Sequence, residues 1–180
     1  MITVFSGTNR KNSNSAIIAT YIYELLKLHS DETVQLLKLE DLPNDLLHTN
    51  MYEAAQQSKA LAEIQDQYLI PAQKFFFVVP EYNGGIPGIL KLFIDACSIR
   101  AYNASFKGGK KAALVGISSG RSGGLRGMEY MTGFLNYLSI QVLPNKLHIS
   151  SVESLLDTNH ITDENTRNVL ESQVMDFLKF

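Results

Sequence analysis

Cysteine is nearly absent from this sequence: among 180 residues there is one, Cys97. A single cysteine cannot form an intramolecular disulfide, which is typical of proteins from a reducing compartment. It also cannot build a zinc site from several thiolates. The four histidines are 19, 100 and 12 residues apart, so none forms a short metal-ligand pair. These absences predict a cytoplasmic protein with no metal.

The sequence also lacks an excess of charge of either sign. It has 16 Lys and Arg against 18 Asp and Glu, a net charge of -2 at pH 7. A protein that binds nucleic acid needs a basic surface to neutralise phosphates, so we expect no nucleic acid partner. An electron carrier steered by charge would show a strong surface of one sign, which this composition does not supply.

Long apolar runs are missing as well. No run approaches the roughly 20 residues that a membrane-spanning helix needs, and the segment 1–6 has no basic start. We expect a chain that is neither exported nor embedded in a membrane. Hydrophobic residues nevertheless make up 45% of the chain and charged residues 19%, which indicates a globular core. The length predicts one domain over residues 1–180.

Strand and helix patterns alternate along the chain. Short apolar runs predict strands at residues 2–6, 34–39, 74–80, 112–118 and 141–149, with Pro144 marking an edge or a break in the last. Apolar residues at three- and four-residue spacing predict helices in between, and a last helix that begins near Thr162 or Asp163. Five such units predict an α/β fold with a parallel sheet covered by helices on both sides.

In such a sheet, ligands bind beyond the carboxyl ends of the strands, which directs attention to the loops after strands one, three and four. The first loop, residues 6–15, combines hydroxyl, amide and guanidinium groups at a helix start. Free backbone N–H groups there favour an anion, and Arg10 can add a charged fork. The alternative is that Ser13 or Ser15 only caps the helix. The loop is neither a Walker motif nor a Gly-x-Gly-x-x-Gly fingerprint.

The second loop reads Pro-Glu-Tyr-Asn-Gly-Gly-Ile-Pro-Gly over residues 80–88. Its glycines expose backbone groups to a flat ligand, Tyr82 offers an aromatic ring, and Asn83 offers a donor and an acceptor. The alternative for Asn83 and Gly84 is an ordinary surface turn. That alternative explains Glu81 and Tyr82 less well.

The third loop, residues 118–124, is again rich in glycine. The stretch 116–120 matches Gly-x-Ser-x-Gly, and Asp157 and His160 follow Ser118 in the chain order of an α/β-hydrolase triad. A nucleophile elbow turns directly from strand into helix, whereas here residues 121–124 intervene. A serine hydrolase that uses Ser118 is therefore a minor alternative.

Two of these segments resemble motifs of one family. Residues 7–15 are similar to a Gly-Ser-x-Arg-x-x-Ser-x-Asn phosphate loop, with Thr8 in the serine place and the shorter Ser15 in the asparagine place. Residues 80–91, with Ile94 and Asp95 beyond, are similar to a Pro-Glu-Tyr-Asn loop and the helix that it opens. From residue 2 to about residue 138, the chain resembles the NAD(P)H-dependent FMN reductases, a flavodoxin-like family that includes quinone, chromate and azo-dye reductases.

The resemblance implies a three-layer α/β/α sandwich with strand order 2-1-3-4-5, and FMN as cofactor. The residues implied to bind FMN fall into three groups. The phosphate would contact Thr8, Arg10, Ser13, Asn14 and Ser15. The isoalloxazine ring would lie along Pro80, Glu81, Tyr82, Asn83 and Gly84, with Ser118, Ser119, Gly120 and Arg121 on its other side.

The resemblance also implies ping-pong chemistry, in which NADPH or NADH delivers a hydride and a second, small acceptor takes the electrons. A quinone, an azo compound, a metal oxyanion or free flavin all fit that role. The flavin carries the chemistry, so no catalytic residue is assigned. A homodimer or homotetramer is implied too. The main alternative is a flavodoxin-type electron carrier, which would share the fold and FMN.

Several other residues are assigned to structure. We expect Cys97, Met128 and Met131 to be buried, and Lys91 and Asp95 to pair along one helix. Lys107, Lys110 and Lys111 precede the fourth strand. The alternatives are a site that attracts a nucleotide phosphate and a solvated turn, and we favour the turn for so short a basic run.

Overall fold

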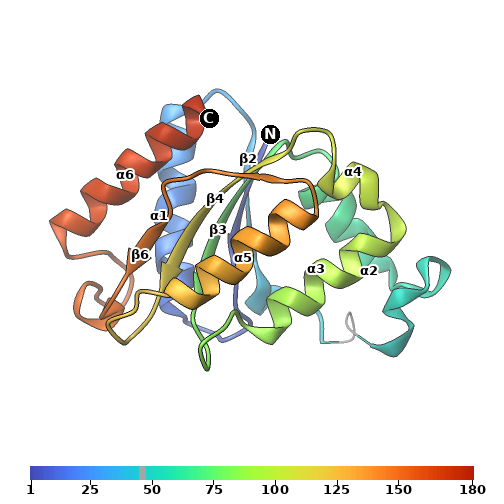
Figure 1. Ribbon diagram of the computed structural model, residues 1–180, viewed down its shortest axis with the longest axis horizontal. Helices are drawn as coiled ribbons and strands as arrows, with labels where there is room; N and C mark the ends of the chain where they lie inside the picture. Colours follow the sequence, from blue (N-terminus) through green and yellow to red (C-terminus); the bar gives the residue numbers. More distant parts are fainter. Residues whose placement is uncertain (45–47) are drawn as a thin grey trace.

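The computed structural model describes residues 1–44 and 48–180 and contains one parallel sheet, in the order β2-β1-β3-β4-β5 (Figure 1). The strands are β1 (Ile2–Ser6), β2 (Val34–Lys38), β3 (Lys74–Pro80), β4 (Lys111–Ile117), β5 (Gln141–Val142) and β6 (Leu147–Ile149). The α/β class and the strand order 2-1-3-4-5 are therefore confirmed. Because β1 and β3 are neighbours while β2 lies outside β1, the strand order reverses beside β1, which is where ligands bind in such sheets.

The last strand, expected over residues 141–149, is interrupted near Pro144, which the sequence marked as an edge or a break. β5 pairs with Lys111 and Ala112 at the start of β4, and β6 pairs with residues 115–117 at its end. Pro144 lies between the two segments. Since proline has no N–H to give to a sheet, the pairing is interrupted there and resumes at Leu147.

Helices cover both faces of the sheet (Figure 1). On the first face lie α1 (Asn14–His29) and α6 (Glu164–Lys179). On the second lie α2 (Lys59–Ile64), α3 (Gly88–Arg100), α4 (Tyr102–Phe106) and α5 (Leu125–Tyr137), with α2 continuing in a π-helical turn (Gln65–Leu69). Asp163, one of the two expected caps, accepts a hydrogen bond from Thr166 N at the start of α6. The short helix α4 was not predicted.

Short 3₁₀ turns fill the connections between these elements. They span Leu39–Asp41, Thr49–Tyr52, Ala54–Gln56 and Val152–Ser154. Across the two described ranges, we find no helix that is both long enough and apolar enough to cross a bilayer.

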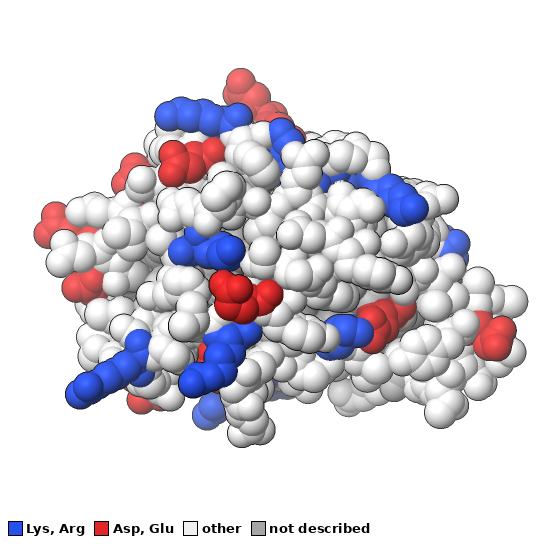
Figure 2. Space-filling view, viewed as in Figure 1, with Lys and Arg blue, Asp and Glu red and all other residues white. Residues whose placement is uncertain are grey.

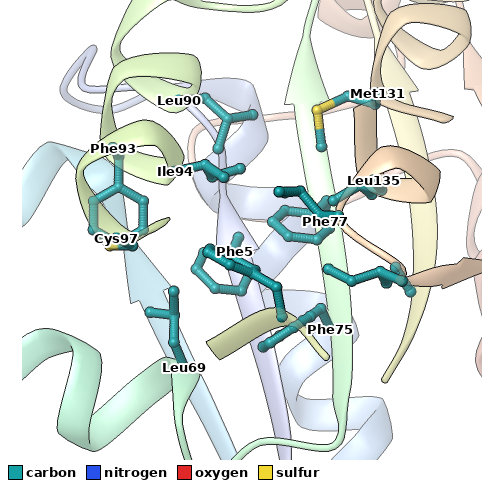
Figure 3. Packing of buried hydrophobic residues seen from close by; sticks show 14 of the residues in the cluster. Phe5, Leu69, Phe75, Phe77, Leu90, Phe93, Ile94, Cys97, Met131 and Leu135 are labelled. Carbon is teal, nitrogen blue, oxygen red and sulfur yellow. The ribbon is translucent and has the colours of Figure 1, made fainter. Parts of the chain in front are cut away.

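The core under α3 and α5 is aromatic (Figure 3). The rings of Phe5 and Phe77, on the neighbouring strands β1 and β3, stack with centroids 4.6 Å apart. Cys97 is fully buried in this cluster, and burial raises the pKa of its thiol far above the usual range. Met128 and Met131 are also fully buried. All three residues are core residues, as predicted.

The prediction of a solvated lysine turn is wrong for Lys110. This side chain is 2% exposed, and its Nζ donates to the carbonyls of Leu69 (2.8 Å) and Ile70 (3.2 Å). Burial lowers the pKa of Lys110 to about 8. Lys107 remains exposed, whereas Lys111 donates to the carbonyl of Phe180. Spacing alone cannot show that one lysine of a basic run turns inward.

Candidate functional site

A cavity of about 420 Å³ lies at the carboxyl ends of β1, β3 and β4, within the size range of small-molecule sites. Four segments of the chain meet there. The lining residues are Arg10, Lys11, Asn12, Ser13, Asn14 and Ser15, then Pro80, Glu81 and Tyr82, then Ile117, Ser118 and Ser119, and finally Val152 and Glu153. The structure thus brings together parts of all three loops that the sequence singled out.

The start of α1 forms the wall of the cavity that has the most hydrogen-bond donors. Ser13 caps the helix by accepting from Ala16 N (3.2 Å), so the capping interpretation is right for Ser13, and its hydroxyl proton stays available. Within residues 1–44 and 48–180, no protein group accepts from the backbone N–H groups of Asn14 or Ser15. The first turn of α1 carries no acidic residue. With Arg10 and Lys11 beside it, this end of the helix offers the donor set that a phosphate requires.

Thr8 lies behind this wall and does not line the cavity. It is fully buried, and its Oγ1 is 2.9 Å from the hydroxyl of Tyr82 and accepts from Arg10 N (3.2 Å). The hydroxyl of Thr8 therefore joins the first loop to the second. Its direct contact with a phosphate stays a prediction.

The tip of the second loop is a tight turn. Tyr82 and Gly85 exchange two backbone hydrogen bonds of 2.9 and 3.0 Å around Asn83 and Gly84, whose φ values are +52° and +77°. Two successive positive φ values are those of a type I′ turn, for which Asn-Gly is the preferred pair. Asn83 and Gly84 are exposed at this tip and do not line the cavity, so the structure agrees with the turn interpretation for them.

Glycines of the third loop serve close packing. A Cβ on Gly116 would lie 2.7 Å from the carbonyl oxygen of Gly123, and one on Gly123 would lie 2.7 Å from the backbone of His148. The loop is thereby pressed onto β4 and β6. Ser118 and Ser119 line the cavity, while Gly120 and Arg121 are exposed away from it.

The hydrolase alternative gains no support from the geometry. Ser118 Oγ donates to the carbonyl of Gly120 (2.9 Å), and His160 Nδ1 lies 3.1 Å from Asp157 Oδ1 on an exposed turn. In the part of the chain that the structure describes, no hydrogen bond joins Ser118 to His160. Of the two glycines in the Gly-x-Ser-x-Gly match, Gly116 is required by the packing of β4 on the third loop, whereas Gly120 is open to solvent.

A fourth wall was missed by sequence reasoning. Val152 and Glu153 belong to the 3₁₀ turn after β6, and Val152 N donates to the carbonyl of Ser118 (3.1 Å). The sequence did contain a signal for this wall, namely the expected end of the fifth strand at residue 149. In a parallel sheet the chain after every strand emerges at the same edge, so the segment after residue 149 belonged with the other loops.

A second, larger hollow of about 740 Å³ lies between α3 and α5. The expected Lys91–Asp95 ion pair (2.6 Å) is found in it, beside Tyr130, Phe134 and Tyr137. Figure 2 shows few and scattered charged atoms on this side of the molecule. Among the described residues, no three His, Cys, Asp or Glu side chains are grouped as metal ligands.

Comparison with known proteins places the chain among flavin reductases. A model of the family described as NADPH-dependent FMN reductase matches residues 1–154. A 2-hydroxy-1,4-benzoquinone reductase of Burkholderia sp is 31% identical over 174 residues, covering 95% of this chain and 90% of the relative. A quinone reductase of Pseudomonas putida is 28% identical over 177 residues, covering 98% and 91%.

Solved structures agree on the fold. The flavoenzyme NAD(P)H:(acceptor) oxidoreductase FerB of Paracoccus denitrificans superposes with a TM-score of 0.79 at 23% identity, covering 99% of this chain and 94% of that one. A flavodoxin from the domain Archaea gives 0.63 at 15%, covering 99% and 95%. The family match confirms the resemblance, the oxidoreductase class, and FMN with a reduced nicotinamide as the cofactors. The chain belongs to the NADPH-dependent FMN reductase family.

Proposed function

We propose that this protein holds FMN in the 420 Å³ cavity, takes electrons from NADPH or NADH, and passes them to a small quinone. One observation carries the proposal. Asn14 and Ser15, whose backbone N–H groups have no acceptor among the described residues, line the same cavity as the ends of β3 and β4. One side of the cavity therefore suits a phosphate, and the other suits a flat ring.

The residues present fit FMN. The Ser13 hydroxyl and the amides of Asn14 and Ser15 would hold the phosphate, with Arg10 and Lys11 adding positive charge. The ring would lie between residues 80–82 and residues 118–119. Bound FMN would itself accept and then donate the electron pair. The roles left to this chain are to bind and orient its ligands and to exclude water. We take residues 1–180 as one FMN-binding domain, because α6, beyond the matched range, packs on α1.

The ping-pong order is part of the proposal, with one opening serving both substrates. A cavity of about 420 Å³ lies toward the small end of single-ligand sites, and FMN itself would fill most of it. The nicotinamide and the acceptor would then reach the exposed face of the ring in turn. We propose a quinone as that acceptor because the most similar relatives include two named for quinone reduction. Azo compounds, metal oxyanions and free flavin remain acceptors to be measured beside it.

The test is to load the purified protein with FMN and follow oxidation of NADPH and of NADH with 1,4-benzoquinone. We expect a yellow complex, and parallel lines in double-reciprocal plots of rate against each substrate. Protein that binds no FMN and oxidises neither nicotinamide would overturn the proposal. Bound FMN without nicotinamide oxidation would favour the flavodoxin-type carrier, and intersecting lines would contradict the ping-pong order.

We further propose a cytoplasmic homodimer or homotetramer in which a second copy covers the α3–α5 hollow. Tyr130 and Tyr137 on this face are 48% and 83% exposed, and its few charges suit neither a basic nor an acidic partner. Because α3 and α5 begin at the second and third loops, a copy seated there would approach the exposed turn at Asn83. Light scattering should show an oligomer that Tyr130→Glu dissociates, while Tyr52→Glu, at another exposed tyrosine, leaves it intact. A monomeric wild-type protein would refute the assembly.

A further inference from the structure

We propose that Glu81 is a positioning residue. Its carboxylate, at the rim of the cavity, caps α5, and this contact holds the second and third loops beside the flavin ring at one spacing. The inference rests on the proposed function, because it treats the cavity as the FMN site. It departs from the expectation that Glu81 simply lies along the ring.

The contacts of Glu81 all point to the third loop. Its backbone N–H donates to the carbonyl of Ile117 (2.9 Å), which extends the β3–β4 pairing one residue past Pro80. Its side chain is 9% exposed. Oε2 accepts from Arg126 N (3.1 Å), and Oε1 accepts from Arg126 Nη1 (3.2 Å) and, more weakly, from Ser122 Oγ (3.4 Å). Both oxygens are therefore engaged by the protein.

Helix α5 needs this contact because its own sequence supplies no cap. The residue in the capping position is Gly124, at a φ of +81°, and the first turn carries no acidic residue. A carboxylate at a helix N-terminus satisfies a free amide and interacts favourably with the helix dipole. Glu81 provides it from a different loop. Two helices thus begin near the cavity, α5 with its N-terminus neutralised and α1 with its amides free for a phosphate.

The cap also presses α5 onto the second loop. The Arg126 side chain lies over the turn, since a Cβ on Gly84 would be 3.6 Å from Arg126 Cδ. The next residue of α5 also packs on the second loop, since a Cβ on Gly127 would be 3.6 Å from Ile86 Cγ2. The Glu81 side-chain contacts therefore join the second loop to Ser122 of the third loop and to the start of α5. Losing them frees these segments from the second loop, while the backbone hydrogen bond between Glu81 and Ile117 remains.

The experiment compares Glu81→Ala, Glu81→Gln and a control, Glu63→Ala, which removes an exposed acid from α2. Two quantities are measured: the FMN dissociation constant, and hydrogen exchange at the first turn of α5 in the FMN-free protein. We expect Glu81→Ala to weaken FMN binding about tenfold and to speed exchange at the Arg126 amide. Glu81→Gln, whose amide oxygen can still accept from Arg126 N, should bind FMN within about threefold of wild type. Glu63→Ala should change neither quantity.

Each contrary result has a distinct meaning. Glu81→Ala with wild-type FMN affinity would overturn the positioning role, even if its melting temperature falls. Glu81→Gln as weak as Glu81→Ala, with Arg126→Met at wild-type affinity, would show that the negative charge is needed for something other than the Arg126 contacts, which also overturns it. If Glu81→Ala does not fold, the positioning role is tested with Glu81→Gln and Arg126→Met. Arg126→Met keeps the hydrogen bond from the residue 126 backbone N–H to Glu81, so its FMN dissociation constant should stay within about threefold of wild type. Wild-type protein that binds no FMN refutes the proposed function, while the exchange measurement still tests the cap.

Discussion

The two edges of the sheet use their polar groups in opposite ways. At the amino-terminal edge, lysines are engaged by backbone carbonyls: Lys74 donates to Phe177 (3.2 Å) and Leu178 (3.0 Å), and Lys110 donates to Leu69 and Ile70. At the carboxyl-terminal edge, Arg10 and Lys11 stay exposed around the free amides of α1. The first arrangement secures helix ends, and the second leaves donors for a ligand.

The comparison teaches that stability and binding are separated in space. Substitutions among the exposed donors at the start of α1 should change FMN affinity with little effect on folding, whereas Glu81, at the same edge, contributes to both. Substitutions at the amino-terminal edge should do the reverse.

The largest effect is expected from Asn14→Asp, which places a negative charge at the start of α1. Near 5 Å, a unit charge opposes another by roughly 3 kcal/mol at an effective dielectric constant of about 20. The phosphate of FMN should therefore bind at least about a hundredfold more weakly, whereas riboflavin, which has no phosphate, should bind as before. The FMN-free protein should be unchanged or more stable by about 0.5 kcal/mol, because an acid suits a helix N-terminus.

The matched control is Asn165→Asp, the same change in the first turn of α6, where the residue is exposed. It should leave FMN affinity unaltered. The measurements are FMN and riboflavin titrations, with thermal unfolding of the FMN-free variants. Equal FMN binding by Asn14→Asp and wild type would place the phosphate elsewhere.

A smaller effect is expected from Arg10→Ala combined with Lys11→Ala. Both side chains line the cavity but are exposed, so solvent weakens their attraction for the phosphate. We expect FMN binding to weaken about five- to thirtyfold in low salt and less in high salt, where exposed charges are screened. Arg121→Ala is the matched control, because Arg121 is exposed outside the cavity. If Arg121→Ala weakens FMN as much as the double variant, the sequence-based assignment of Arg121 is right and the cavity lining is incomplete.

The features that local pattern decides could be predicted from the sequence. Apolar runs such as residues 74–80 are buried strands because both faces of a parallel sheet are covered. The break near Pro144 follows from a missing N–H. The Asn-Gly turn and the Ser13 cap are likewise properties of a few neighbouring residues.

The remaining features depend on contacts between residues far apart in the chain. Glu81 lines the cavity, and its expected place along the ring stays a prediction, but its carboxylate is turned toward Arg126 and Ser122, about 40 residues later. Val152 and Glu153 line the cavity because β6 pairs with β4 after Pro144, which places the turn that follows β6 at the same edge of the sheet. The ammonium of Lys110 can be buried because two carbonyls, 40 and 41 residues earlier in the chain, accept hydrogen bonds from it. No local pattern records such partners.

The smallest effect is expected at the amino-terminal edge, from Lys110→Met. Burial lowers the pKa of Lys110 to about 8 from the usual 10.5, so between these values the unfolded chain binds a proton that the folded chain does not. Stability must then rise with pH across that window, by at most about 1.4 kcal/mol per pH unit, and below pH 8 the desolvation cost is present in full. Lys110→Met leaves two carbonyls unpaired but removes that cost. We expect a net loss of about 1 kcal/mol at pH 7, with FMN affinity unchanged.

The measurement is urea unfolding of wild type and Lys110→Met at pH 7 and at pH 9.5, with exposed Lys107→Met as control. Wild type should gain stability relative to Lys110→Met at the higher pH, because only wild type can shed this buried charge on folding. Lys107→Met should follow wild type at both values. Parallel pH profiles for wild type and Lys110→Met would mean that the ammonium is fully compensated by the Leu69 and Ile70 carbonyls. A change in FMN affinity in Lys110→Met would instead show that the two edges of the sheet are coupled.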